Sequence, residues 1–368
     1  MRRLIMNASR FNQLLAALFL ASMAQQAFAY TTIKCGGSST KWSGNNYTVR
    51  ASSVGFPVGP WRDALSSVVS HWNGNPSNLS FGVVWNEPAV AANNNENEAW
   101  WEANNGPNIG TYPAVTYVWF KGDCTLKEAD VIFNNSVAFH YTTSKTSLWP
   151  YGGANRPFQT TAMHEFGHAA GLAHTANTYN IMGSDWTHIH ANGATATAYS
   201  GEDANNGLVA VYGLWTGGPE DLGVVHWKHT GSSGEYSTHG RTRILDTSNI
   251  ELAKVAGTAE PVYRVNKGQT IKLELTYENL GKTSPLSAKV GYYLSSNDII
   301  SVADRFLGEG NVTLYRGFPD TTFNTFLVIP TDLVSGQTYW VGAIIDYNNA
   351  YSERSETNNA TYIGIRVN

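Results

Sequence analysis

Charged residues and cysteines are scarce in this sequence. Asp, Glu, Lys and Arg make up 14% of its 368 residues, and there are two cysteines. Because the formal net charge is −4, the chain has no excess of basic side chains, and we do not expect it to bind nucleic acid. Its content of hydrophobic residues, 42%, excludes a chain that is disordered throughout.

Glycine and the aromatic residues are plentiful. The sequence contains 35 Gly, 12 Trp, 19 Tyr and 14 Phe. Such a composition is typical of an ordered protein rich in β-structure. Because the chain is longer than one hydrophobic core usually organises, we expect two domains.

The first 29 residues are typical of a secretory signal peptide. Three arginines lie within the first ten residues, and an apolar stretch follows over residues 14–24. Ala27 and Ala29 flank Phe28 in the pattern of a cleavage site. The apolar stretch is short for a membrane span, which needs about 20 residues, and no later segment fills that role. We therefore expect a secreted protein with no membrane span.

The two cysteines are Cys35 and Cys124. In an exported protein an even number of cysteines favours a disulfide, which would tie the start of the mature chain to a loop about ninety residues further on. A free Cys35 thiolate that acts as a removable metal ligand is the alternative.

The first half of the chain alternates strand-like runs with amphipathic segments. Apolar residues recur at spacings near 3.6 between Trp61 and Trp72 and predict a first helix. Gly171 suits the end of a second helix over residues 158–170, and a third is expected over residues 202–212. Strands are predicted over residues 46–51, 79–85, 114–120 and 129–134.

From residue 261 onward the pattern changes to short alternating strands that are separated by turn residues. Seven such runs at roughly even spacing predict a β-sandwich of immunoglobulin-like architecture. Residues 215–259 are rich in Gly, Ser, Thr and His and show little periodicity. We expect them to form a linker that holds at most one or two strands.

Residues 164–174 read HEFGHAAGLAH. On a helix, His164 and His168 project from the same face, because they are four residues apart, and they can bind one ion. Gly171 can adopt a positive φ, which lets the chain leave the helix and bring His174 round as a third nitrogen ligand. Three neutral imidazoles leave one tetrahedral position open, as in a catalytic rather than a structural zinc site.

Glu165 lies beside the first of these ligands and is not needed to bind the metal. Its carboxylate is therefore expected to act as the general base, which takes a proton from the attacking water and passes it to the departing amine. The predicted reaction is hydrolysis of a peptide bond without a covalent intermediate. The five fixed positions of HExxHxxGxxH make this signal much stronger than HExxH alone; a chance helix and a zinc site without catalysis are the alternatives.

This motif and the residues after it resemble the metzincin zinc metalloproteases, in their matrixin-like branch. Residues 180–183 read Asn-Ile-Met-Gly, and Met182 follows His174 by eight residues, a separation similar to that in matrixins. The resemblance covers about residues 41–213. It implies a mixed twisted sheet with about three helices, and it implies that Met182 forms the Met-turn, an apolar floor beneath the metal site and not a ligand.

The sequence also departs from the matrixin pattern. It has no counterpart of the additional histidines and acidic residues that hold the structural zinc and calcium ions of vertebrate matrixins. Residues 183–186 replace the Pro-containing segment that usually shapes the primary specificity pocket, so cleavage preference cannot be carried over. Matrixins commonly stay latent through a propeptide cysteine on the zinc, and for this reason the metal-ligand alternative for Cys35 stays open.

Residues 261–368 resemble the bacterial cell-adhesion-related, CARDB-like β-sandwich modules. The matching segments are residues 277–281, 293–297, 304–308 and 346–359. Their acidic and Asn-rich turns are compatible with Ca²⁺, but Asp and Asn also build turns without an ion, so no calcium site is assigned. Such a module could hold substrate, a glycan or a cell surface near the catalytic cleft.

Together these features predict an α+β metzincin-like catalytic domain followed by an all-β immunoglobulin-like sandwich. The expected division is a signal peptide (1–29), a catalytic domain (30–214), a linker (215–259) and the accessory sandwich (260–368). The predicted function is a secreted zinc endopeptidase that cleaves extracellular proteins, with the substrate added as a strand to a sheet edge near residues 114–120. The alternative is a surface or matrix-binding adhesin in which proteolysis is secondary.

Overall fold

The structure is a computed structural model that describes residues 30–175, 180–183, 189–226, 242–316 and 321–368. The predicted signal peptide, residues 1–29, lies outside the described residues. So do residues 184–188, which contain most of the segment that replaces the Pro-containing one of matrixins.

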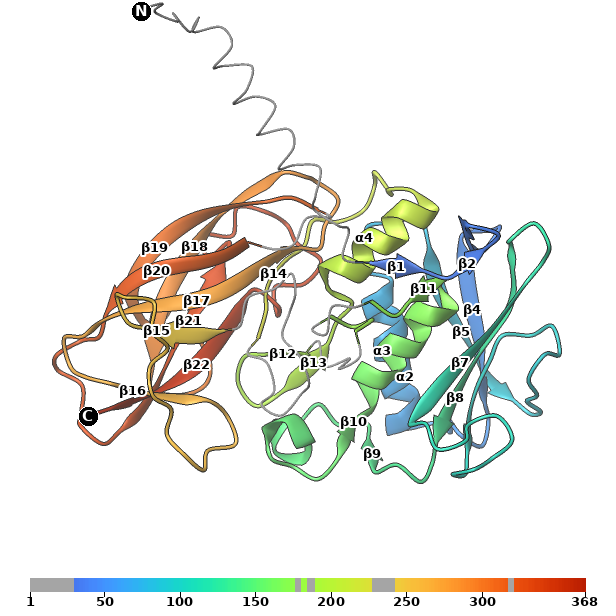
Figure 1. Ribbon diagram of the computed structural model, residues 1–368, viewed down its shortest axis with the longest axis horizontal. Helices are drawn as coiled ribbons and strands as arrows, with labels where there is room; N and C mark the ends of the chain where they lie inside the picture. The colour runs from blue at the N-terminus through green and yellow to red at the C-terminus, as the bar shows by residue number, and fades with distance from the viewer. Residues whose placement is uncertain (1–29, 176–179, 184–188, 227–241, 317–320) are drawn as a thin grey trace, which may run out of the picture.

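A five-stranded mixed sheet organises the N-terminal half (Figure 1). Its strands are β4 (Asn46–Ser52), β5 (Ser80–Glu87), β6 (Glu98–Glu102), β7 (Ala114–Phe120) and β8 (Leu126–Asn134), in the order β5-β4-β6-β8-β7. All neighbours are parallel except β7, which runs antiparallel to β8 at the edge of the sheet. The four strands predicted for this half are confirmed, and β6 is an additional one.

The helices of the described chain are α2 (Pro60–Trp72), α3 (Phe158–Ala169) and α4 (Gly201–Tyr212). Helix α2 begins with a proline, whose fixed φ suits a first helical turn, and buries Leu65, Val68 and Trp72. The indole N–H of Trp72 donates to the carbonyl of Met163 at 3.1 Å and ties α2 to α3. In Figure 1 the helices lie between the five-stranded sheet and the C-terminal half.

The C-terminal half is a β-sandwich of two sheets around one core. The first sheet contains β14 (Leu222–Val224), β15 (Arg243–Leu245), β17 (Thr270–Asn279) and β20 (Thr321–Val328). The second contains β16 (Val262–Val265), β18 (Leu286–Ser295), β19 (Arg305–Leu314), β21 (Thr338–Ile345) and β22 (Ala360–Val367). Leu273 from the first sheet and Val290 and Ile345 from the second belong to the same buried cluster, which confirms the predicted sandwich.

Two of these strands come from the segment that was expected to be a linker. Strands β14 and β15 lie within residues 215–259, and both pair with β17. Each is three residues long, too short to show a sequence period. These residues complete the first sheet of the sandwich instead of merely joining two domains.

The remaining elements are short. They are the pairs β1 (Thr31–Thr32) with β11 (Leu172–Ala173), β2 (Lys34–Cys35) with β3 (Ser38–Ser39), β9 (Phe139–His140) with β10 (Arg156–Pro157) and β12 (Ile189–Ala191) with β13 (Ala196–Ala198), and the 3₁₀ turns η1 (Lys145–Ser147) and η2 (Trp149–Tyr151).

The predicted fold class is wrong. Strand residues make up 41% and helical residues 14% of the described chain, which is therefore predominantly β and not an α+β metzincin-like domain joined to a sandwich. The amphipathic segments form helices of only 12 or 13 residues, whereas the Gly-rich and aromatic segments around them form many short strands. The predicted helices are present, but they are short, and the more numerous strands dominate the fold.

The two halves of the molecule are packed against each other. Ile189 of β12 and Tyr151 of η2 belong to the buried cluster of the sandwich. The Lys145 ammonium, almost fully buried, lies 3.1 Å from Glu260 Oε1 and 2.5 Å from Asp298 Oδ2. Apolar contact and ion pairing thus fix the sandwich against the half that carries the histidine motif.

Cys35 and Cys124 form a disulfide, and their Cα atoms are 5.4 Å apart. The predicted pairing is confirmed. Because its sulfur is bonded to Cys124, Cys35 is not a free thiolate, and its alternative role as a removable metal ligand is wrong.

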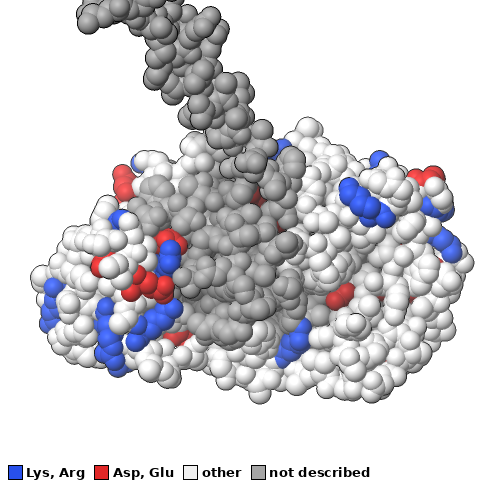
Figure 2. Space-filling view, viewed as in Figure 1, with Lys and Arg blue, Asp and Glu red and all other residues white. Residues whose placement is uncertain are grey.

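The surface is weakly charged on the face that Figure 2 shows. Basic and acidic side chains are interspersed there in small groups, and much of the visible surface carries neither. None of the helices that the structure describes has the length and apolarity needed to cross a bilayer.

Candidate metal centre

Helix α3 carries the first two histidines of the motif, and a glycine turn brings in the third. Gly171, two residues after the end of α3, has a φ of 93°, as expected for a sharp exit from the helix. A Cβ atom at this position would lie 2.8 Å from the carbonyl oxygen of Thr40, so both the backbone conformation and the available space require glycine. The chain then forms β11, and His174 follows directly.

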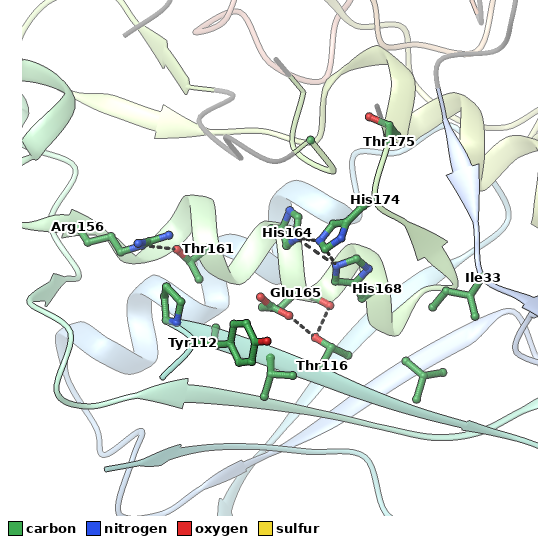
Figure 3. A pocket seen from close by; sticks show the side chains of 15 residues that line it. Ile33, Tyr112, Thr116, Arg156, Thr161, His164, Glu165, His168, His174 and Thr175 are labelled. Carbon is green, nitrogen blue, oxygen red and sulfur yellow. Dashed lines mark hydrogen bonds between the residues drawn. The ribbon is translucent and has the colours of Figure 1, made fainter. Parts of the chain in front are cut away.

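The three histidine rings converge, as Figure 3 shows. The Nε2 atom of His164 lies 3.0 Å from that of His174 and 3.1 Å from that of His168, and the last two are 3.1 Å apart. In a tetrahedral zinc site with Zn–N distances of about 2.0–2.1 Å, any two ligand nitrogens are about 3.3–3.4 Å apart. The observed spacing is close to this value.

The hydrogen bonds of Nδ1 determine which tautomer His164 and His168 adopt. Nδ1 of His164 donates to the carbonyl of Ile181 at 2.6 Å, and Nδ1 of His168 donates to the carbonyl of Leu172 at 2.9 Å. Because a carbonyl can only accept, the proton lies on Nδ1, and Nε2 presents a lone pair. Lone pairs that face one another repel unless a cation lies between them, so these residues fit a zinc ion.

Burial keeps the rings of His164 and His168 neutral. It lowers the pKa of His164 well below its ordinary value, and the neighbouring His168 adds to the effect. Burial likewise lowers the pKa of His168 to about 4. Neutral imidazole is the form that binds metal.

Met182 packs beneath the same helix. Its side chain is 2% exposed, and a Cβ atom added to Gly167 would overlap its Sδ atom and lie 3.0 Å from its Cε atom. The preceding residue, Ile181, supplies the carbonyl that holds His164. The turn over residues 180–183 therefore supports the helix and orients one of the three rings.

Glu165 is buried and points toward the edge strand β7. The hydroxyl of Thr116 lies 2.7 Å from Glu165 Oε2 and 3.0 Å from its carbonyl oxygen, so it can donate to either. Burial raises the pKa of Glu165 to about 7, whereas the hydrogen bond from Thr116 and the positive charge of Arg156 act in the opposite direction. A carboxylate with a pKa near neutrality is suited to proton transfer.

Thr116 and Arg156 are site residues that the sequence analysis missed. Thr116 is 49 residues from Glu165 in the chain and lies in an ordinary strand pattern. No local motif marks either residue, and only the packing of β7 against α3 brings Thr116 to the carboxylate.

A cavity of about 610 Å³ opens beside the three histidines and Glu165. Its wall includes Ala114, Val115, Thr116 and Val118 of β7, which is the edge strand as predicted. Its other lining residues are Ile33, Tyr112, Pro113, Arg156, Thr161, Thr175 and Gly183.

Within the described ranges, two groups of side chains are spaced so that they could hold a metal ion. One is the histidine trio, and the other consists of Glu87, Glu96 and Glu98 in the N-terminal half. The acidic turns of the sandwich form no such group among the residues that the structure describes.

Comparisons with known proteins do not establish a family. No protein-family model matches the chain, and no curated protein matches it. A CARDB domain from Pyrococcus furiosus, solved in complex with di-metal ions, is 18% identical over 41% of this chain and 90% of its own, with a TM-score of 0.25. A lytic polysaccharide monooxygenase from Streptomyces lividans is 18% identical over 30% of this chain and 60% of its own, with a TM-score of 0.18.

These scores are too low to carry a conclusion about fold or function. The metzincin resemblance has no support from these structures.

Proposed function

We propose that this protein is a zinc-dependent endopeptidase whose ion is held by His164, His168 and His174. The observation that carries the proposal is the convergence of three histidine Nε2 atoms, each within 3.1 Å of the other two, beside a buried carboxylate and an open cavity. A zinc ion held by these three histidines would supply Lewis-acid activation of water and of the scissile carbonyl. The metzincin resemblance of HExxHxxGxxH and Met182 supports the same class.

Glu165 performs the proton transfers in this proposal. Its carboxylate takes a proton from the attacking water and delivers it to the amine that leaves. The Thr116 hydroxyl, 2.7 Å from Oε2, fixes the orientation of the carboxylate, so that Oε1 is the oxygen that exchanges the proton. Arg156 adds a positive charge that favours the ionised form of Glu165.

A peptide in extended conformation is the substrate that best suits the cavity. Among the described strands β7 pairs with β8 alone, so its other side can accept an added strand. Residues 114–116 and 118 line the cavity, next to Glu165. Main-chain hydrogen bonds to β7 would hold a peptide independently of its side chains, and pockets would select among sequences.

The same proposal places the enzyme outside the cell. The pattern of residues 1–29 is that of a signal peptide, and the disulfide between Cys35 and Cys124 suits an oxidising compartment. The substrates are then extracellular proteins or peptides, and the sandwich would bind a glycan or another surface ligand near the cleft.

A peptide library derived from a whole proteome tests the proposal. Wild-type protein supplied with zinc should cleave internal bonds of the library, and a chelator should stop the cleavage. Glu165→Gln keeps the size of the side chain and all three histidines, so it should retain zinc and lose at least about a thousandfold in rate. A library that stays intact, or a Glu165→Gln variant as active as wild type, would refute the proposal.

A further inference from the structure

Three glutamates meet where strand β5 ends and strand β6 begins. Glu87 is the last residue of β5, Glu98 is the first residue of β6, and Glu96 lies in the segment between them. One carboxylate oxygen from each lies within 4.8 Å of the other two. Oxygens bound to one Ca²⁺ at about 2.3–2.6 Å are at most about 5 Å apart, so the three side chains can reach a single ion as they stand.

Within the described part of the chain, one carboxylate oxygen of Glu98 has no hydrogen-bond partner. The residue is 0% exposed. Its Oε2 atom accepts hydrogen bonds from the backbone N–H of Ala91 and the side-chain amide of Asn94, both at 2.9 Å. Its Oε1 atom is also buried and has no hydrogen-bond partner among the residues that the structure describes. A buried carboxylate oxygen that nothing compensates is strongly destabilising, so this atom points to a missing ligand.

Several acidic side chains surround Glu98. Arg50 lies 3.3 Å from Glu87 Oε2 and 3.5 Å from Glu96 Oε1, and thereby brings one positive charge to the group. The neighbouring strand β8 adds Glu128 and Asp130, which are both fully buried. Asp130 is in direct contact, because its Oδ1 accepts the backbone N–H of Glu98 at 2.9 Å. Burial raises the pKa of Asp130 to about 8, so this carboxyl is largely protonated at neutral pH. If the other four carboxylates are ionised, they and the guanidinium sum to −4 + 1 = −3, a charge that favours a cation.

We propose that Glu87, Glu96 and Glu98 form a second metal site, distinct from the histidine trio, that holds Ca²⁺. Glu98 Oε1 is the buried ligand, and the more exposed Glu87 and Glu96 close the site on the solvent side. A set of carboxylate oxygens suits a hard cation such as Ca²⁺, whereas zinc prefers the nitrogen ligands of the histidine site. A bound ion ties the end of β5 to the start of β6 and fixes the intervening segment, residues 88–97.

A proton on Glu98 is the competing explanation of the unpartnered oxygen. Burial raises the pKa of Glu98, although the hydrogen bonds from Ala91 and Asn94 oppose the shift. A protonated carboxyl would be neutral and would need no ion. The two explanations differ in one measurable respect, since only the metal site predicts a response to Ca²⁺.

Calcium titration of the full chain distinguishes a bound Ca²⁺ ion from a proton on Glu98. Zinc-loaded protein is dialysed into calcium-free buffer that contains zinc, and CaCl₂ is then added in a calorimeter and in thermal unfolding experiments. We expect one binding event at this site and, at a hundredfold excess over the dissociation constant, a rise in Tm of about 3 °C or more. Zinc content is measured in each sample, so the result does not depend on the proposed peptidase activity.

Two variants and a control variant show whether calcium binds at the three glutamates. Glu98→Gln removes the buried charge and should abolish this binding event. Glu96→Gln changes a side chain that is 43% exposed, so it should fold normally and weaken calcium binding about tenfold or more. Asp332→Asn, an exposed acid of the sandwich, should respond to calcium as wild type does. No response of the wild type, or a response of Glu98→Gln and Glu96→Gln equal to it, overturns the proposal.

Discussion

Substitution of Gly167 by alanine tests how the histidine helix is supported. Gly167 lies in α3 directly before His168, and the side chain of Met182 fills the space where a Cβ atom would be. The added methyl group would overlap Met182 Sδ, so either Met182 or the helix must move. Met182 follows Ile181, whose carbonyl holds Nδ1 of His164 at 2.6 Å, and a displaced turn would misorient that ring.

Two opposing contributions determine how Gly167→Ala changes the free energy of unfolding. Alanine is more favourable than glycine inside a helix by up to about 1 kcal/mol, whereas overpacking a core costs about 1–3 kcal/mol. We therefore expect Gly167→Ala to lower the free energy of unfolding by about 0–2 kcal/mol. Zinc affinity should fall more visibly, about 10- to 100-fold, because the hydrogen bond that orients His164 is disturbed.

Zinc competition against a chromophoric chelator and chemical denaturation measure the two quantities. The double variant Gly167→Ala with Met182→Ala removes the overlap, so it should recover part of the lost zinc affinity, although Met182→Ala alone leaves a cavity. A Gly167→Ala protein that binds zinc as tightly as wild type would refute the claim that Met182 and the 180–183 turn position the metal ligands.

Two further predictions concern Thr116 and Asp221. Thr116→Val deletes the hydroxyl that orients Glu165, so kcat should fall about ten- to a hundredfold with zinc content unchanged; an unaltered kcat would exclude this positioning role. Burial raises the pKa of Asp221 to about 7, so the folded chain binds its proton more tightly than the unfolded chain does. The resulting stabilisation is complete below about pH 4 and is lost as the pH rises through 7, at up to about 1.4 kcal/mol per pH unit. Asp221→Asn should flatten the dependence of unfolding free energy on pH between 5 and 7 in urea titrations, and a slope equal to that of wild type would contradict this assignment.

Local patterns in the sequence predicted the elements that have a clear period or clear end residues. Helices α2, α3 and α4 fall close to their predicted positions, and the chain after residue 261 forms the predicted succession of strands. Strand β6 was missed because its five residues, Glu-Ala-Trp-Trp-Glu, do not alternate. Residues 215–259 were expected to hold at most one or two strands, but the positions of β14 and β15 could not be predicted, because three residues form a strand only when a partner such as β17 is present.

The histidine trio could be predicted because its geometry is local. The spacing of His164 and His168 on a helix and the positive φ of Gly171 follow from a stretch of eleven residues. Thr116 could not be predicted in this way, because it reaches Glu165 from a strand far away in the chain. The cluster around Glu98 was missed for the same reason, since Glu87 and Glu98 come together only when β5 and β6 take their places in the sheet.

The most direct test of the central claim is the molar ratio of zinc to protein, measured by elemental analysis of the purified full chain after exposure to excess zinc and desalting. We expect one zinc ion per chain for the wild type and close to none for His168→Ala, which lacks one of the three nitrogen ligands. A wild-type protein without zinc, or a His168→Ala variant with as much zinc as the wild type, would contradict the assignment of the metal centre.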